Sequence, residues 1–239
     1  FIVSMTVSTL IAFLLERIAY RPLRNAPRLI PLITAIGASF TLMYLFRGLF
    51  GTGFQAYPVW AIFTGKWVLF KGLEIGKIQV FVIFAAALVM ITLYLFIQRT
   101  RTGKAVRSVS EDKEAASLMG VDIDKTISVT FIIGGAAAGA AGVLYALVFK
   151  QVFFMMGFIP GIKAFTAAVL GGIGNIPGAM LGGLLLGLLE SLGPSLFLDG
   201  YNIAAPYQLK DAIAFLVLVL VLIFRPTGLL GERLAIKKA

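Results

Sequence analysis

The sequence lacks cysteine and histidine altogether, and only 13% of its 239 residues are charged. Without cysteine there can be no disulfide and no thiolate metal site, and without histidine there is no imidazole ligand and no imidazole general base. We therefore expect no catalytic residue, no metal site and no cofactor. An ordinary soluble domain is about 25% charged, so the low charged share indicates a membrane protein.

Hydrophobic residues, by contrast, make up 59% of the chain and form long uncharged runs. The uncharged runs are 1–15, 29–46, 78–98, 127–149 and 164–189, and a further apolar segment, 207–224, carries Lys210 and Asp211 near its start. They predict an all-α fold, a polytopic transmembrane helical bundle with a broken or re-entrant helix hairpin. The formal net charge of +10 lies in short clusters between these segments, which indicates orientation in a lipid bilayer and not binding to nucleic acid.

The first run, 1–15, is shorter than the about 20 residues that cross a hydrocarbon layer of about 30 Å. We interpret it as the end of a truncated spanning helix and expect an N-terminal portion before it. The following residues, 16–28, are predicted to be a loop, and their arginines place it in the cytoplasm by the positive-inside rule. These arginines are Arg17, Arg21, Arg24 and Arg28.

The sidedness of the next segments follows from that loop. The run 29–46 crosses outward, 47–77 is an external loop, and 78–98 returns the chain to the cytoplasm. Trp60 and Trp67 in the external loop are typical of an aromatic belt at the membrane interface. The segment 99–126 is therefore predicted to be cytoplasmic.

This cytoplasmic segment is the longest hydrophilic interruption of the chain, and we predict a short helix there, outside the membrane. A group of small residues closed by a glycine marks the helix: Glu114, Ala115, Ala116 and Gly120. On these residues alone, a solvated amphipathic loop helix explains the pattern as well as a docking element does.

The run 164–189 is interrupted by GGIGNIPG at 171–178. Irregular backbone at membrane depth is tolerated only where protein or a water-lined cavity satisfies its amides and carbonyls. We place 150–163, which includes Lys163, in a loop outside the membrane and predict a hairpin in which 164–174 enters from there and 177–192 returns, so that 207–224 crosses inward. Gly174, Asn175 and Pro177 are candidates for lining a substrate pathway, and close packing is an equally good interpretation of the glycines. Small residues four apart also predict close packing in 127–149, namely Gly135 with Gly139 and Ala138 with Gly142.

No energy source is visible in the chain itself. None of its Gly-Lys pairs is followed by Ser or Thr, as a Walker A sequence requires. We interpret Glu190 and Asp211 as markers of the membrane boundary and not as a proton relay. The pattern favours a transporter subunit driven by another protein, and the alternative is a secondary carrier or channel that acts alone.

Three stretches then carry a resemblance: ERIAYRPLRNAPRLIPLITAIG at 16–37, RTGKAVRSVSEDKEAASLMGVDIDK at 101–125 and GIKAFTAAVLGGIGNIPGAMLGGLLLGLLE at 161–190. Together they resemble the inner-membrane permease subunits of branched-chain amino-acid ABC importers, and most of all the first of the two permeases in the leucine/isoleucine/valine system. The resemblance implies a single transmembrane permease domain over 1–239, in a bacterial or archaeal cytoplasmic (inner) membrane. It also implies that the chain is not an enzyme.

The partners implied by the resemblance are two cytoplasmic ATPase subunits, a second and homologous permease, a periplasmic or surface-anchored substrate-binding protein, and the lipid bilayer. Glu114, Ala115, Ala116 and Gly120 map onto the motif with which such permeases dock into the ATPase, within a coupling loop at 99–126. The I-x-L-P element that follows this motif in many importers is absent here. The implied function is import of branched-chain amino acids, and a urea or short-chain amide permease of the same family is the alternative.

Overall fold

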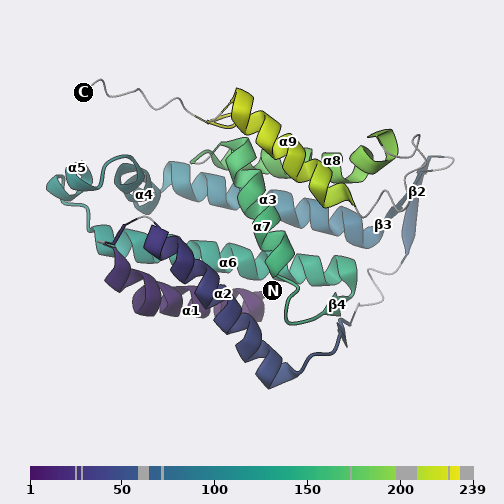
Figure 1. Ribbon diagram of the computed structural model, residues 1–239, viewed down its shortest axis with the longest axis horizontal. Coiled ribbons are helices and arrows are strands. Elements are labelled where there is room, and N and C mark those ends of the chain that lie inside the picture. Colours follow the sequence, from purple (N-terminus) through teal and green to yellow (C-terminus); the bar gives the residue numbers. More distant parts are fainter. Residues whose placement is uncertain are drawn as a thin grey trace. The chain divides into compact units, whose positions relative to one another are not determined.

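The computed structural model describes residues 1–24, 26–27, 29–58, 65–70, 73–172, 174–197, 209–225 and 227–231 (Figure 1). The chain divides into two compact units, Phe1–Gly157 and Phe158–Ala239, both built mainly of helices. Several residues named above lie outside the described part: Arg28, Trp60, the side chain of Asp211 and everything after residue 231.

The helices of the first unit are α1 (Ile2–Leu15), η1 (Glu16–Tyr20), η2 (Arg21–Leu23), α2 (Leu29–Phe50), α3 (Lys77–Arg99), α4 (Arg101–Glu111), α5 (Lys113–Leu118) and α6 (Ile123–Phe149). Its strands are β1 (Gln55–Ala56), β2 (Lys66–Phe70), β3 (Leu73–Gly76) and β4 (Gln151–Val152). The second unit contains α7 (Phe158–Gly171), α8 (Ile176–Phe197) and α9 (Lys210–Phe224). Among the described residues, five helices are long and apolar enough to cross a membrane: Ile2–Leu23, α2, α3, α6 and Ile176–Pro194.

The helix that starts with α1 does not stop at Leu15, because it continues through the π-helical η1 and the 3-10 turn η2. The prediction of a loop from residue 16 is therefore wrong for 16–23, and the apolar helix is longer than the run 1–15. Two local features explain the continuation. The carboxylate of Glu16 is paired with Arg24, and Pro22 lies in the first turn of η2, where its missing N–H is not needed.

α1 packs antiparallel against α6, the most extensive helix pair of the first unit. Near the start of α1, the Ser4 hydroxyl donates a hydrogen bond to the Gly139 carbonyl, with an O–O distance of 3.0 Å. Just beyond the other end of α1, Ser128 donates to Glu16 at 2.8 Å. The two helices thus meet along the whole length of α1.

The glycines of α6 explain this close approach. A Cβ added to Gly135 would lie 2.6 Å from the Cβ of Ala12, and one added to Gly139 would lie 2.7 Å from the Ser4 carbonyl oxygen. The prediction of close packing at this glycine pair is confirmed. Gly142 differs, because a Cβ there meets nothing within 4 Å in the described part of the chain.

Replacing Gly139 with leucine should therefore destabilise the first unit by about 1–3 kcal/mol, the usual cost of overpacking, since the clash is with backbone that cannot rotate away. Gly142→Leu on the same helix is the matched control, and should leave stability within about 0.5 kcal/mol. Thermal unfolding of the detergent-solubilised chain measures both. Equal losses in the two variants would contradict the assigned contact.

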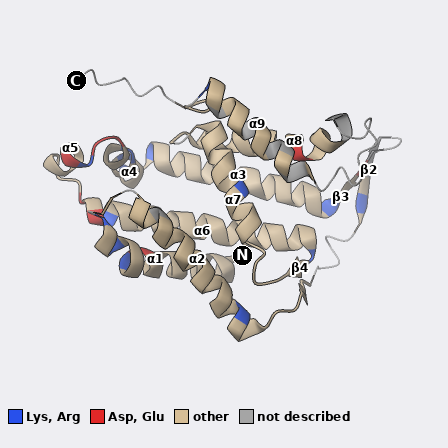
Figure 2. Ribbon diagram, viewed as in Figure 1, with Lys and Arg blue, Asp and Glu red and all other residues tan. Residues whose placement is uncertain are grey.

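The loops of the first unit gather at its two ends (Figure 1). Residues 16–24 lie at the same end as α4 and α5, because Arg21 and Arg24 pair with Asp124 near the start of α6. At the opposite end β1 pairs antiparallel with β4. The predicted sidedness requires 16–28 and 99–126 to share one side and 47–77 to face the other, and this arrangement agrees with it. Figure 2 shows long stretches of α3 and α6 without charge between the two ends.

The predicted external loop 47–77 is partly regular. α2 extends past Arg47, whose guanidinium lies 5.9 Å from the ring centre of Tyr44 and 5.6 Å from that of Phe154. Strands β2 and β3 form an antiparallel hairpin in which Trp67 is opposite Ile75. Strands this short leave no long alternating pattern, so the sequence did not reveal them.

In the second unit α7 packs antiparallel on α8, and a Cβ on Gly182 would lie only 2.2 Å from the Ala167 carbonyl oxygen. α7 begins at Phe158, so Lys163 lies inside this helix and not in the external loop where the sequence placed it. With 14 residues α7 is too short to span a bilayer. That α7 and α8 form a re-entrant pair in the membrane stays a prediction.

Candidate functional site

The segment between α3 and α6 folds as two short helices, not as the single helix predicted. The Thr100 hydroxyl accepts the Gly103 N–H at 3.0 Å and so caps α4. A Cβ on Gly103 would lie 2.3 Å from the Ile97 carbonyl oxygen, so glycine allows α4 to turn back sharply against the end of α3. Arg107 holds α4 there by donating to the Gln98 side chain at 2.8 Å.

Asp112 separates α4 from α5. Its backbone is extended, which ends α4. Its carboxylate accepts the backbone N–H groups of Glu114 at 2.9 Å and Ala115 at 3.1 Å, which caps the N-terminus of α5. A good N-cap residue in the middle of a polar helix signals such a division, and this signal was present in the sequence.

Gly120 ends α5 in a Schellman motif. Its φ is +84°, its N–H donates to the Ser117 carbonyl at 2.9 Å, and the Val121 N–H donates to the Ala116 carbonyl at 3.0 Å. The glycine is required for this left-handed backbone and not for lack of space, because a Cβ there meets nothing within 4 Å among the described residues.

α6 begins immediately after this motif, with Asp122 as its N-cap. The Lys125 backbone N–H donates to the Asp122 carboxylate at 3.0 Å. This hydrogen bond, followed by that from the Lys125 side chain, lowers the pKa of Asp122 below its ordinary value. The start of α6 is therefore fixed within a few residues of Gly120.

The residues predicted to face a partner do not all face outward. Glu114, Ala115 and Gly120 are exposed, but Ala116 is 4% exposed and packs inside its own chain. Leu118 and Met119 are 89% and 85% exposed, and the sequence reasoning did not single them out. Two adjacent apolar side chains in a polar segment were the available signal. We refer to Glu114, Ala115, Leu118, Met119 and Gly120 as the α5 surface.

An ion-pair network joins the start of α6 to the end of α1. Glu16, 1% exposed, is paired with Arg24 and also accepts the Ser128 hydroxyl at 2.8 Å. Arg24 pairs as well with Asp124, which Arg21 contacts at 3.1 Å. A buried carboxylate is stable only with such partners.

The break between α7 and α8 is closed by the segment 227–231, which follows α9. The Leu229 and Leu230 N–H groups donate to the carbonyls of Leu170 at 2.9 Å and Gly171 at 3.0 Å, which caps the C-terminus of α7. The contact is very close, because a Cβ on Gly172 would lie 2.4 Å from the Gly231 nitrogen. We call this contact the α7–α9 junction.

The three predicted pathway residues lie at this junction. The Asn175 side chain donates to the Leu230 carbonyl at 3.1 Å and accepts the Gly178 N–H at 3.0 Å, which caps α8. Pro177 lies in the first turn of α8, where proline fits. Gly174 is exposed with a φ of +95°. Asn175 thus has a structural role, and Gly174 is the residue open to solvent or to another molecule.

A second buried ion pair links α7 to α8. The Lys163 ammonium lies 2.9 Å from a Glu190 carboxylate oxygen, and both side chains are about four-fifths buried. Glu190 lies near the end of the apolar stretch Ile176–Pro194 of α8 and contacts a neighbouring helix, and its predicted place at the membrane boundary stays a prediction. Charged pairs between apolar helices are rare and hold those helices in register.

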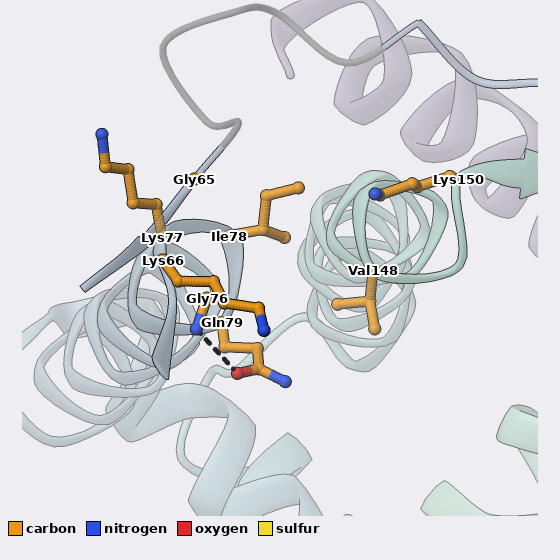
Figure 3. Close-up of a pocket in the computed structure, with 8 residues that line it drawn as sticks. All are labelled: Gly65, Lys66, Gly76, Lys77, Ile78, Gln79, Val148 and Lys150. Carbon is orange, nitrogen blue, oxygen red and sulfur yellow. Dashed lines mark hydrogen bonds between the residues drawn. The ribbon is translucent and has the colours of Figure 1, made fainter. Parts of the chain in front are cut away.

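A pocket of about 470 Å³ lies at the end of the first unit away from α5 (Figure 3). Lys77 and Gln79 at the start of α3 line it on one side, and Val148 and Lys150 at the end of α6 line it on the other. Among the described residues, the lining contains no carboxylate or hydroxyl and so offers no acid-base pair. Lysines at helix ends are typical of the membrane interface.

The helices, the scarcity of charge along them and the polar segments at the unit ends define a multi-pass helical membrane protein. Comparison with known proteins identifies the family more narrowly. The family described as "Branched-chain amino acid transport system / permease component" matches residues 1–222, and this chain belongs to it. None of the solved structures matches the chain.

Individual relatives agree with this family assignment. The chain is 44% identical to the high-affinity branched-chain amino acid transport system permease protein BraD of Pseudomonas aeruginosa, over 97% of this chain and 74% of the relative. It is 40% identical to the LivH permease of Escherichia coli K12, over 97% and 73%. A more distant relative, 27% identical over 80% and 52%, is the autoinducer 2 import system permease LsrC of Yersinia enterocolitica.

These findings confirm the main predictions from the sequence. The chain is a permease of the cytoplasmic (inner) membrane, and its relatives support the branched-chain amino-acid system over the urea, carrier and channel alternatives. The predicted coupling role of Glu114, Ala115, Ala116 and Gly120 and the predicted pathway role of Gly174, Asn175 and Pro177 stay predictions.

Proposed function

We propose that this chain is the membrane-spanning permease subunit of an ATP-driven importer that moves branched-chain amino acids into the cytoplasm. The observation that carries the proposal is the match to the permease family over residues 1–222. Two cytoplasmic ATPase subunits would supply the energy, a second permease would complete the pathway, and a binding protein would deliver the substrate. The sequence, which has no Walker A motif, fits a subunit driven from outside.

The α5 surface is the proposed contact with an ATPase. The Asp112 cap and the Schellman motif at Gly120 hold α5 in a fixed shape, so that Leu118 and Met119 project from a rigid turn. Exposed apolar side chains beside small residues suit insertion into an apolar cleft, with Glu114 at the rim for a basic group. Closure of the ATPases on ATP would then displace α5 and, through the short connection, the start of α6.

The α7–α8 hairpin is the proposed wall of the substrate pathway. Its break exposes Gly174 while its helix ends stay capped by Asn175 and the segment 227–231. Irregular backbone of this kind is tolerated where it lines a cavity in the protein.

Reconstitution tests the proposal directly. The chain, its second permease and the two ATPases are placed in lipid vesicles, and uptake of labelled leucine is followed with the binding protein outside and ATP inside. Uptake should require ATP, both ATPases and the binding protein. Leucine uptake without ATP would contradict the proposal, and uptake of labelled urea or acetamide in place of leucine would support the amide alternative.

Gly120 provides a sharper test of the coupling role. Gly120→Val should lower the leucine moved per ATP hydrolysed, because a β-branched residue at a φ of +84° costs about 1–3 kcal/mol and the turn must change shape. Gly120→Asn is the matched control, since asparagine adopts this backbone more readily, and it should couple almost normally. Unchanged ATP-driven uptake in the valine variant would remove the assigned role.

A further inference from the structure

Glu16 and its ion-pair network join the end of α1 to the start of α6, the helix that follows α5 in the chain. We propose that Glu16 is a positioning residue for coupling: through Arg24 it ties the start of α6 to the end of α1, so that the two helices move together when α5 is displaced. This inference rests on the proposed function and adds to it the route by which movement enters the membrane.

The route has two short steps. α5 ends at Gly120, and Asp124 follows as the second residue of α6. A displacement of α5 therefore reaches Asp124 through a connection fixed by the Schellman motif and by the Asp122 cap. Asp124 is paired with Arg24, and Arg24 with Glu16.

The geometry of Arg24 makes this link specific. One terminal nitrogen, Nη1, contacts Asp124, and the other, Nη2, contacts Glu16, so a single planar guanidinium joins two carboxylates. Lysine cannot reproduce this, because its ammonium is a single point charge. The Asp124 carboxylate is 52% exposed and can respond to movement outside the membrane, whereas Glu16 is fixed inside the fold at 1% exposed.

The end of α1 is also built in an unusual way. η1 has π-helical hydrogen bonding from Glu16 to Tyr20, and such turns occur frequently at functional sites. Before η1 in the chain, α1 itself is held against α6 by the close contacts of Gly135 and Gly139. Movement passed to Glu16 would therefore shift α1 and α6 as one body and would not separate them.

The test measures the leucine taken up per ATP hydrolysed in vesicles that contain the complete importer. Glu16→Gln keeps the size of the side chain and removes its charge, and it should lower this ratio by about two- to thirtyfold, the range expected for residues on a coupling route. Glu16→Asp restores the charge and should recover part of the ratio. A purely structural role would lower the amount of complex and leave the ratio unchanged.

Glu74→Gln is the matched control, because it removes a 2.6 Å ion pair with Lys66 at the other end of the unit, and its ratio should equal that of the native protein. If Glu16→Gln does not assemble, Asp124→Asn replaces it, since that half-exposed carboxylate can be removed without leaving Glu16 unpaired. An unchanged ratio in whichever variant assembles overturns the proposal. Absence of ATP-driven uptake in the native complex would instead overturn the proposed function.

Discussion

Replacing Leu118 and Met119 with aspartate should release the ATPase subunits from the permease. The two side chains are 89% and 85% exposed in the described chain, and together they form the apolar part of the α5 surface. A charge placed in an apolar cleft must lose its water without gaining a partner. Loss of a central apolar contact costs at least about 2 kcal/mol, or about thirtyfold in affinity.

Co-purification of the ATPases with the permease measures this loss, and insertion of the permease into membranes should stay normal because neither side chain contributes to its core. The matched control exchanges the two residues, Leu118→Met with Met119→Leu, which keeps the apolar surface and volume. It should retain the ATPases. Normal retention by the double aspartate variant would show that the ATPase binds elsewhere.

The sequence located the α5 segment but not the side chains that it exposes. The polar interruption at 99–126 and its small residues were evident from hydropathy and composition. The sequence did not show which of these side chains point outward, because a helix of six residues is too short for a periodic pattern. Ala116, which looked like part of the docking motif, is buried, and Leu118 beside it is exposed.

The sequence also did not reveal which partners the charged residues in the helices have. The sequence placed Glu16 and Lys163 in loops because charge is expensive in lipid. Each instead lies in a helix next to an opposite charge. Glu16 is paired with Arg24, eight residues along the chain, and accepts the Ser128 hydroxyl from α6, whereas Lys163 is paired with Glu190 on the next helix. A partner from another helix changes the cost of a charge, and one-dimensional counting of charged residues does not include that partner.

The close packing of glycines could be predicted only in part. The Gly135 and Gly139 contact was predictable, because small residues four apart on one long helix form a stripe. The glycines at 171–178 predicted a break, but they did not reveal that the segment 227–231 fills it. That contact joins residues from opposite ends of the second unit, and only the fold brings them together.

The α7–α9 junction provides the last prediction, since two of its glycines have similar backbones and different surroundings. Gly172 and Gly174 have φ values of +108° and +95°, so alanine costs a similar strain of about 1–2 kcal/mol at either position. Only at Gly172 does the new Cβ also meet backbone, 2.4 Å from the Gly231 nitrogen. At Gly174 it meets nothing within 4 Å in the described part of the chain.

Gly172→Ala should therefore displace the segment 227–231 and leave the Leu170 and Gly171 carbonyls without their donors, at a further cost of about 1–3 kcal/mol for each unpaired group. The chain has no cysteine, so a single Leu229→Cys substitution provides a unique maleimide label. Labelling should become faster in Gly172→Ala and not in Gly174→Ala. If Gly174 lines the pathway, Gly174→Ala should reduce leucine uptake, because the added methyl group narrows the route. Labelling of Leu229→Cys should then stay at the native rate, because the junction does not open. Equal labelling in both variants would show that the segment does not close the break.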